Sequence, residues 1–188
     1  MGIFKNIKAE LIAVNTKCEL KDLVDKTIEK EGPNCDLNFI DTSRITDMSY
    51  LFNGSYFSGD ISCWDVSNVE DMCCMFYNSC FNGDISKWNV LNVKNMNGMF
   101  FGSQFNGDIS DWDVSNVMNM RRMFAYSKFN NDISNWDVSR VKDMNSMFSN
   151  SIFNGDISGW DVSKVADMSW IFYGSTLKEL HNLPKWYK

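Results

Sequence analysis

Tryptophan recurs every 24 residues through the middle of the chain, and its neighbours recur with it. The repeat reads F-N-G-D-I-S-x-W-D-V-S-x-V-x-D-M-x-x-M-F-x-x-S-x with few substitutions, and a degenerate copy precedes it at residues 36–56. A fixed period of this length is typical of solenoids, in which each unit buries its apolar face against its neighbours. Function is then a property of the surface that stacking creates. The repeat tryptophans are Trp64, Trp88, Trp112, Trp136 and Trp160.

Each repeat predicts a short strand followed by a helix of about two turns. Residues 85–90 are too few for a helix and include Ile85, Trp88 and Val90, which favour a strand. Apolar residues in 93–100 then fall three or four positions apart, the spacing of one helical face. A Ser usually separates the two segments and suits a helix N-cap. The Trp and Met columns share these faces with Ile, Val and Phe, so they are predicted to form the core.

Two columns of the repeat carry Gly or Asn, the residues that best tolerate a positive φ. The first column ends the expected helix, and its exception, Tyr126, is expected to carry local strain. The second column lies in the next turn, where the single substitute for Gly is Asn131; this indicates a positive φ instead of a need for a small side chain. The first column is Gly54, Asn78, Gly102, Tyr126, Asn150 and Gly174; the second is Gly59, Gly83, Gly107, Asn131 and Gly155.

The two ends of the chain depart from the repeat and predict caps. Thr16 and Glu19 form a capping box, apolar residues in 20–28 form a helical stripe, and Gly32 ends it. The C-terminal end contains Pro184, which suits a terminal edge strand. The chain is expected to form one domain, with an N-terminal helical cap at 1–32, six repeats at 33–56, 57–80, 81–104, 105–128, 129–152 and 153–176, and a C-terminal cap at 177–188.

Composition argues against several functional classes. The net charge of −6 disfavours a nucleic-acid role, which needs clustered Lys and Arg. No 18-residue apolar run is present, so no membrane insertion is expected, and residues 1–14 lack the pattern of a secretory signal, so a cytoplasmic location is expected. None of the six cysteines recurs with the period, no C-x-x-C occurs and there is one histidine. Free thiols and no metal site are predicted from the cysteines.

An unbroken acidic column follows the second Gly column. Stacked carboxylates repel one another unless each has hydrogen-bond donors or a cation. Two interpretations follow: weak Ca²⁺ binding between turns, or capping of the backbone N–H groups of each turn. Two neighbouring columns exchange Asp with Asn, which favours the capping interpretation. The acidic column is Asp60, Asp84, Asp108, Asp132 and Asp156.

The positions that vary within the fixed repeat are where a recognition surface can be encoded. Aromatic and arginine side chains, the residue types enriched in binding hot spots, occur at several of them. A merely solvated surface is the alternative interpretation. The candidate partner-binding residues are Tyr77, Phe101, Arg121, Arg122, Tyr126 and Trp170.

The whole unit, W-D-V-S-x-V-x-x-M-x-x-M-F-x-x-S-x-F-N-G-D-I-S, resembles the repeat of BspA-type leucine-rich-repeat surface proteins, especially a mycoplasma-lipoprotein-type subfamily of unknown function. The resemblance covers about 140 of the 188 residues. It implies a parallel-stranded solenoid and a role in adhesion or protein recognition at a cell surface or virion. One column departs from the leucine-rich-repeat asparagine: Asn68, Asn92 and Asn116 come one position early, and the column continues as Arg140 and Lys164.

These patterns predict an α/β repeat solenoid, a leucine-rich-repeat-like stack of short parallel strands, each followed by a short helix, with terminal caps. With one histidine and no nucleophile motif or phosphate-binding loop, the chain is predicted to be neither an enzyme nor a cofactor protein. The leading hypothesis is a non-enzymatic protein-interaction or adhesion solenoid of microbial or phage origin, which binds an unidentified protein partner. The alternatives are a structural component of a virion or envelope, and a cation-stabilised adhesin that uses the Asp column.

Overall fold

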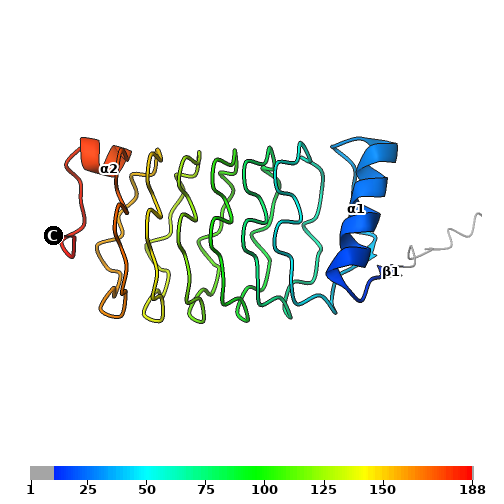
Figure 1. The fold of residues 1–188 in the computed structure, drawn as a ribbon, viewed down its shortest axis with the longest axis horizontal. Coiled ribbons are helices and arrows are strands. Elements are labelled where there is room, and N and C mark those ends of the chain that lie inside the picture. Colours follow the sequence, from blue (N-terminus) through cyan, green and yellow to red (C-terminus); the bar gives the residue numbers. More distant parts are fainter. Residues whose placement is uncertain (1–10, 188) are drawn as a thin grey trace, which may run out of the picture.

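The computed structural model of the protein describes residues 11–187. The chain passes through a series of similar coils that lie one behind another along the long axis of the molecule (Figure 1). Helix α1 (Lys17–Glu31) covers one end, and the short helix α2 (Thr176–Glu179) lies near the other. Strand β1 (Ile12–Ala13) pairs in parallel with β2 (Ile40–Asp41), with Ile12 opposite Ile40. Residues 1–10 of the predicted N-terminal cap, and residue 188 of the C-terminal cap, lie outside the described residues.

Parallel backbone hydrogen bonds join each coil to the next. Bridges connect residues 24 positions apart, such as Asp71 with Asn95 and Asn95 with Asn119. From the bridge onward, alternate amides donate to the following coil: those of Met72, Cys74, Phe76 and Asn78 reach carbonyls there at 2.7–2.9 Å. This ladder satisfies backbone groups that would otherwise be buried without partners between coils.

The ladder lies on the segment that was expected to be helical. Between residues 42 and 175, all of which the structure describes, there is no helix. Successive tight turns replace it: the amide of Met75 donates to the carbonyl of Met72, and that of Tyr77 to Cys74, both at 3.2 Å. Cys74 (φ 53°) and Asn78 (φ 51°) are left-handed, and the alternate amides of Cys74, Phe76 and Asn78 donate to the next coil, so they do not bond four residues back as in an α-helix.

The expected strand at 85–90 is a turn as well. The amide of Trp88 donates to the carbonyl of Ile85 at 3.1 Å, and that of Val93 to Val90 at 2.9 Å. The expected Ser N-caps therefore have no helix to cap. In most repeats the amide of this Ser is instead held by the Asp side chain two residues earlier, as Asp113 holds Ser115 at 3.0 Å. The strand-and-helix unit is corrected to a coil of consecutive turns joined by single bridges.

The first Gly or Asn column has the predicted backbone conformation. All six positions have positive φ, including Tyr126 at 57°. A second column of the repeat also has positive φ at all six positions. Its sequence does not predict this conformation, because only one of its members is Gly. The column consists of Tyr50, Cys74, Gly98, Arg122, Ser146 and Trp170.

For the second Gly column, the prediction of positive φ is wrong. None of Gly59, Gly83, Gly107, Asn131 or Gly155 has it. At the glycine positions of this column space is short instead: a Cβ at Gly83 would lie 2.8 Å from the ring of Phe81 in the same repeat. Asn131 takes this position with its Nδ2 donating to the carbonyl of Asn106 at 2.6 Å and of Gly107 at 3.1 Å.

The core runs along the whole stack as columns of identical side chains. The five repeat tryptophans are 3–4% exposed, and phenylalanine rings stack from coil to coil at centroid distances such as 5.6 Å for Phe76 with Phe100 and 5.7 Å for Phe100 with Phe124. Each indole Nε1 donates to a carbonyl of the preceding coil, for example Trp88 to Ile61 at 3.2 Å. The polar atom of the Trp column is therefore satisfied without contact with water.

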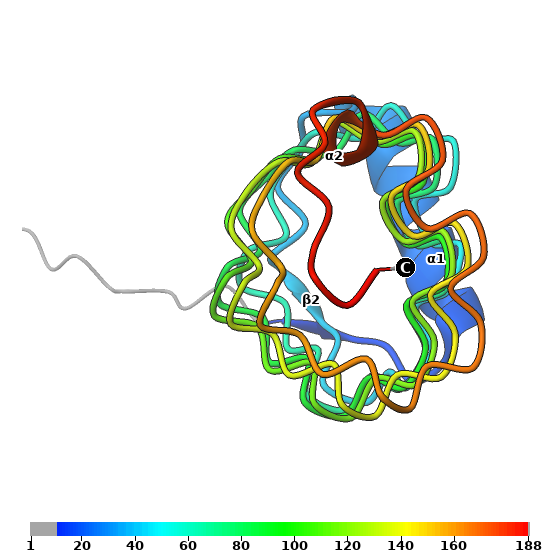
Figure 2. The ribbon, with the colours of Figure 1, turned by 90° about the vertical axis from the view of Figure 1, so that its left-hand side faces the viewer.

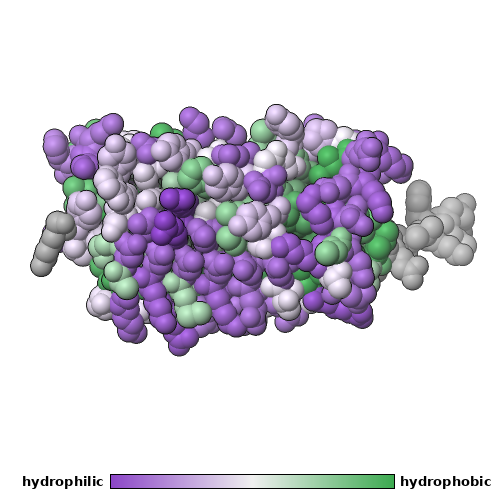
Figure 3. Space-filling model, viewed as in Figure 1, coloured by the Kyte–Doolittle hydropathy of each residue, from purple (hydrophilic) through white to green (hydrophobic). Residues whose placement is uncertain are grey.

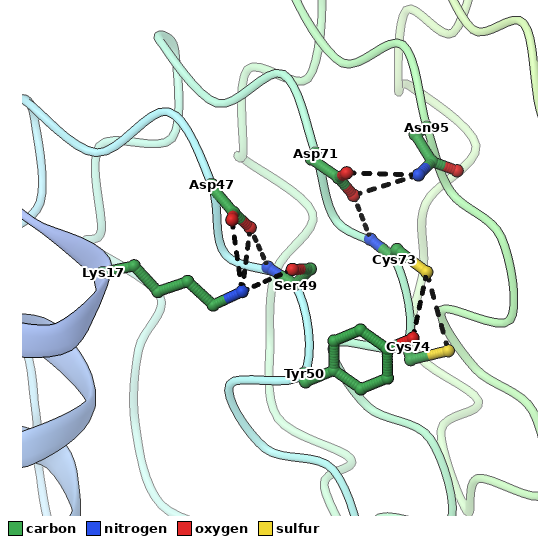
Figure 4. A network of polar contacts seen from close by, with 8 residues as sticks. All are labelled: Lys17, Asp47, Ser49, Tyr50, Asp71, Cys73, Cys74 and Asn95. Atoms are coloured by element: carbon green, nitrogen blue, oxygen red, sulfur yellow. Dashed lines mark hydrogen bonds and ion pairs between the residues drawn. The ribbon is translucent and has the colours of Figure 1, made fainter.

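Helix α1 covers the N-terminal end of the stack. It begins where the capping box predicted, with the Thr16 hydroxyl accepting from the Glu19 amide at 3.2 Å, and ends at Gly32 (φ 91°). Leu20 and Val24 are fully buried against the core. Lys17 reaches the first coil, where its Nζ donates to both carboxylate oxygens of Asp47 at 3.2 Å and to the hydroxyl of Ser49 (Figure 4).

The C-terminal segment lies across the opposite end of the stack (Figure 2). The edge strand expected in 177–188 is absent from its described residues, which form the end of α2 and turns. Trp186 closes the indole ladder: its Nε1 donates to the carbonyl of Ile157 at 2.9 Å and its ring packs on Phe172. Trp186 makes the same hydrogen bond as a repeat tryptophan, although it lies 26 residues after Trp160 and therefore outside the 24-residue period.

Candidate interaction surface

Three aromatic side chains from adjacent coils form a row on the outside of the stack. The rings of Tyr77 and Phe101 are parallel within 3° at a centroid distance of 4.4 Å. Tyr126 continues the row at 5.3 Å from Phe101, tilted by 50°, and 57% of it is exposed. Tyr77 and Phe101 occupy the same repeat position, so the 24-residue period itself places them side by side. We call Tyr77, Phe101, Arg122 and Tyr126 the aromatic face.

A hollow of about 290 Å³ accompanies this row, with polar groups at its edge. Arg122 is exposed and has a positive φ of 55°. The hollow thus combines an aromatic wall with a cation and two hydroxyl groups, a combination suited to recognition of a protein side chain. It is lined by Phe101, Arg122, Ala125, Tyr126, Ser146 and Ser149.

Two of the predicted site residues do not join the aromatic face. Arg121 lies half-buried with its Nη1 4.0 Å from a carboxylate oxygen of Asp143. Trp170 is 64% exposed, but it lies two coils further along the stack and packs edge-on against Tyr173 at 5.2 Å. The structure therefore brings together four of the six candidates.

The acidic columns cap turns. Each carboxylate of the unbroken Asp column accepts the amide two residues on, as Asp84 Oδ1 does from Ser86 at 2.9 Å. These hydrogen bonds, first from the backbone and then from the side chain of Ser86, hold the pKa of Asp84 below its ordinary value. In the neighbouring column, five residues further along each repeat, the same contact forms when Asn replaces Asp: Asn89 Oδ1 accepts a hydrogen bond from the amide of Leu91 at 3.2 Å. Among residues 11–187, no cluster of three or more His, Cys, Asp or Glu side chains is arranged to hold a metal ion.

Two adjacent thiols lie beside the N-terminal ion pair (Figure 4). The Sγ atoms of Cys73 and Cys74 are 3.7 Å apart, and Cys73 Sγ is 3.9 Å from the hydroxyl of Tyr50. Burial and the neighbouring Cys74 raise the pKa of Cys73 to about 11. The Cys73 thiol is therefore protonated at neutral pH and is a poor nucleophile.

A second hollow was missed from the sequence. It has a volume of about 470 Å³ and is formed by two neighbouring repeat columns on the surface. The column that begins with asparagine and continues as Arg140 and Lys164 carries the signal for this hollow in the sequence, although the net charge of the chain is negative. We call this hollow the basic groove; it is lined by Asn92, Lys94, Asn116, Met118, Arg140, Lys142 and Lys164.

Residues 19–126 and 101–186 match the family described as "Mycoplasma protein of unknown function, DUF285". The chain belongs to this family. The two matches overlap within the repeats and together cover residues 19–186. Searches of curated proteins and of solved structures found no match. In the part of the chain that the structure describes, no helix is long and apolar enough to cross a membrane.

Proposed function

We propose that this DUF285 protein is a non-enzymatic recognition protein that binds a protein partner through the aromatic face. The supporting observation is the surface row of Tyr77, Phe101 and Tyr126, in which Tyr77 and Phe101 are half-buried and Tyr126 is exposed. Phe101 and Tyr126 border a hollow with Arg122. Aromatic and arginine side chains are the types that contribute most to binding energy at protein interfaces.

In this proposal the stacked coils are a solenoid of the leucine-rich-repeat type, related to the BspA-type surface proteins. The coil-to-coil hydrogen bonds from Met72 to Asn95 and from Cys74 to Asn97, repeated along the stack, support it. So does the asparagine column, in which Asn92 Nδ2 donates to the carbonyl of Ser67 at 2.7 Å and Asn116 Nδ2 to that of Leu91 at 2.9 Å. The repeated coil supplies a rigid frame, and the variable positions on it specify the partner.

A non-enzymatic role is part of the proposal. The chain has one histidine, His181, which lies exposed in the C-terminal cap and far in sequence from the aromatic face. The buried Cys73 has a raised pKa, the opposite of what a catalytic thiol needs. Recognition requires only the surface that the stack presents.

The test is quantitative affinity capture with paired variants. The purified protein is used to capture proteins from mycoplasma and host-cell lysates, and each candidate partner is then purified and its Kd measured. Phe101→Ser/Tyr126→Ser should weaken binding by about tenfold or more, the size of a hot-spot loss. Tyr56→Ser is the control, because Tyr56 is 79% exposed and lies outside the aromatic face; it should leave the Kd unchanged within about twofold.

Equal binding by the double variant and the wild type would contradict the role of the aromatic face. Failure to find any saturable partner would favour the structural role in a virion or envelope. Circular dichroism of each variant checks that the fold is retained, which matters most for Phe101 because it is half-buried and stacked on Tyr77.

A further inference from the structure

The basic groove is built from two side-by-side columns of the repeat. One column contributes Asn92, Asn116, Arg140 and Lys164 from successive coils, and the other contributes Lys94, Met118 and Lys142. Arg140 Nη1 donates to Asn116 Oδ1 at 2.7 Å, which holds the guanidinium against the preceding coil. The groove therefore runs along the stack, and its shape is fixed by the spacing of the coils.

Its positive charge is largely uncompensated. Lys94 Nζ pairs with a carboxylate oxygen of Glu70 at 2.7 Å, at one end of the groove. Within residues 11–187, Arg140, Lys142 and Lys164 form no ion pair. Three cations thus gather on a protein with a net charge of −6.

Two carboxylates whose pKa values these cations affect, those of Asp137 and Asp161, accept hydrogen bonds from their own turns. Asp137 Oδ1 accepts from the amide of Ser139 at 2.9 Å, and Asp161 Oδ1 from that of Ser163 at 3.0 Å. Hydrogen bonds from these serines are the main reason that the pKa of each Asp is lowered, and the charges of Arg140 and Lys164 add to the effect. The Asp side chains flank the cations without pairing with them.

The middle of the groove is apolar. Met118 takes the place between Lys94 and Lys142 in its column and is 40% exposed. The groove spans three coil steps from Lys94 to Lys164, or roughly 14 Å at the usual inter-strand spacing, which an extended peptide covers in about four residues. The flexible thioether of Met118 can contact an apolar side chain of a ligand, and the cations on both sides of Met118 can pair with carboxylates that flank that side chain.

We infer that the basic groove binds an extended acidic segment of a protein, about four residues long, with an apolar side chain on Met118 and carboxylates on Arg140, Lys142 and Lys164. A nucleic acid fits less well, because no aromatic side chain lines the groove to stack a base. The face of the molecule in Figure 3 is mostly hydrophilic, with hydrophobic residues scattered over it. This inference rests on the proposed role in protein binding, but it uses residues outside the aromatic face.

The test measures fluorescence anisotropy with a labelled, end-capped peptide, Glu-Asp-Leu-Glu-Asp. Arg140→Gln/Lys142→Gln/Lys164→Gln should weaken binding by about tenfold or more. The matched control, Lys87→Gln/Lys128→Gln/Lys178→Gln, removes the same charge from exposed positions outside the groove and should change the Kd less than about threefold. Met118→Ser should weaken the leucine peptide and leave its alanine analogue unchanged.

Equal losses in the two triple variants would overturn the inference, because binding would then depend on total charge alone. Tighter binding of a single-stranded oligonucleotide of the same charge, insensitive to Met118→Ser, would assign the groove to nucleic acid instead. Phe101→Ser/Tyr126→Ser should keep peptide binding intact. Loss of peptide binding in that variant would place the peptide on the aromatic face and overturn the groove assignment, whereas failure of partner capture with intact peptide binding would refute only the proposed function.

Discussion

The indole Nε1 of Trp112 donates a hydrogen bond to the main-chain carbonyl of Ile85 at 3.1 Å, joining residues 27 positions apart. The carbonyl of Ile85 also accepts the amide of Trp88, which closes the turn of its own coil. Each indole therefore ties a turn in one coil to the core of the next. The same arrangement recurs from Trp64 to Trp160 and is completed by Trp186.

Trp112→Ala should lower the free energy of unfolding by about 3–5 kcal/mol, because it removes a buried ring and its hydrogen bond from the middle of the stack. Trp112→Phe keeps part of the ring volume and should cost about 1–3 kcal/mol. Trp170→Ala is the control, since Trp170 is 64% exposed and should change stability little. Urea unfolding measures all three. A loss of only a few tenths of a kcal/mol for Trp112→Ala would contradict the burial of the tryptophan column.

Gly107→Ala should destabilise the protein by about 1–3 kcal/mol through overpacking. A Cβ there would lie 2.8 Å from the ring of Phe105. That ring is fully buried, and its centroid lies 4.4 Å from the ring centroid of Phe100. Gly159→Ala is the matched control, because nothing lies within 4 Å of its Cβ position. Thermal unfolding should separate the two variants, and equal melting temperatures would show that the ring of Phe105 can move.

The period of the repeat, the column of buried indoles and the positive φ of the first Gly or Asn column could be read from the sequence. Position 74 and its equivalents could not. They are left-handed whether the residue is Cys74, Gly98 or Arg122, so composition carries no signal for them. Without that signal, apolar residues spaced three and four apart predict a helix, although the same spacing results from consecutive turns.

For the candidate site, the sequence could identify the residue types but only part of their arrangement. Tyr77 and Phe101 share a column, so the period alone predicts that they stack. Tyr126 joins them from the neighbouring column, which depends on the backbone conformation. Trp186 was missed because its spacing from Trp160 differs from 24, and the contact with Ile157 depends on how the last segment folds back.

Asp84→Asn should melt close to wild type, whereas Asp84→Ala should melt at a lower temperature. Asn keeps an oxygen for the amide of Ser86, and Ala removes it. Millimolar Ca²⁺ should leave the melting temperature of the wild type unchanged. A rise with Ca²⁺ that is reversed by a chelator and lost in Asp84→Asn would instead support the cation-stabilised adhesin.

Acid should destabilise the fold through the Asp columns. Hydrogen bonds from serine amides and hydroxyls lower the pKa values of Asp60, Asp84 and Asp132 in the folded state. The stability that these carboxylates contribute is present above the ordinary Asp pKa of about 3.9 and is lost as the pH falls through their lowered values. The melting temperature should therefore be flat from neutral pH to about pH 5 and fall below about pH 4. A melting temperature that rises on acidification would contradict this capping role.

The six cysteines should react with a thiol reagent at different rates. Cys18, Cys63 and Cys80 are exposed and should react first. Cys35 and Cys73 are buried, and burial raises the pKa of both thiols, so they should react slowly until the protein is unfolded. Reaction with Ellman's reagent at about pH 8, with and without denaturant, measures this difference. Six fast thiols in the native protein would show that the core opens readily.

The stacking of equivalent coils is tested most directly by hydrogen exchange of the indole N–H groups. The chain has seven tryptophans, and ¹⁵N–¹H NMR can follow the indole N–H signal of each. After transfer to D₂O, the signals of Trp64, Trp88, Trp112, Trp136 and Trp160 should persist long after that of the exposed Trp170 has gone, because each of the five donates to a carbonyl inside the stack. Exchange of the five repeat indoles as fast as Trp170 would contradict the stack.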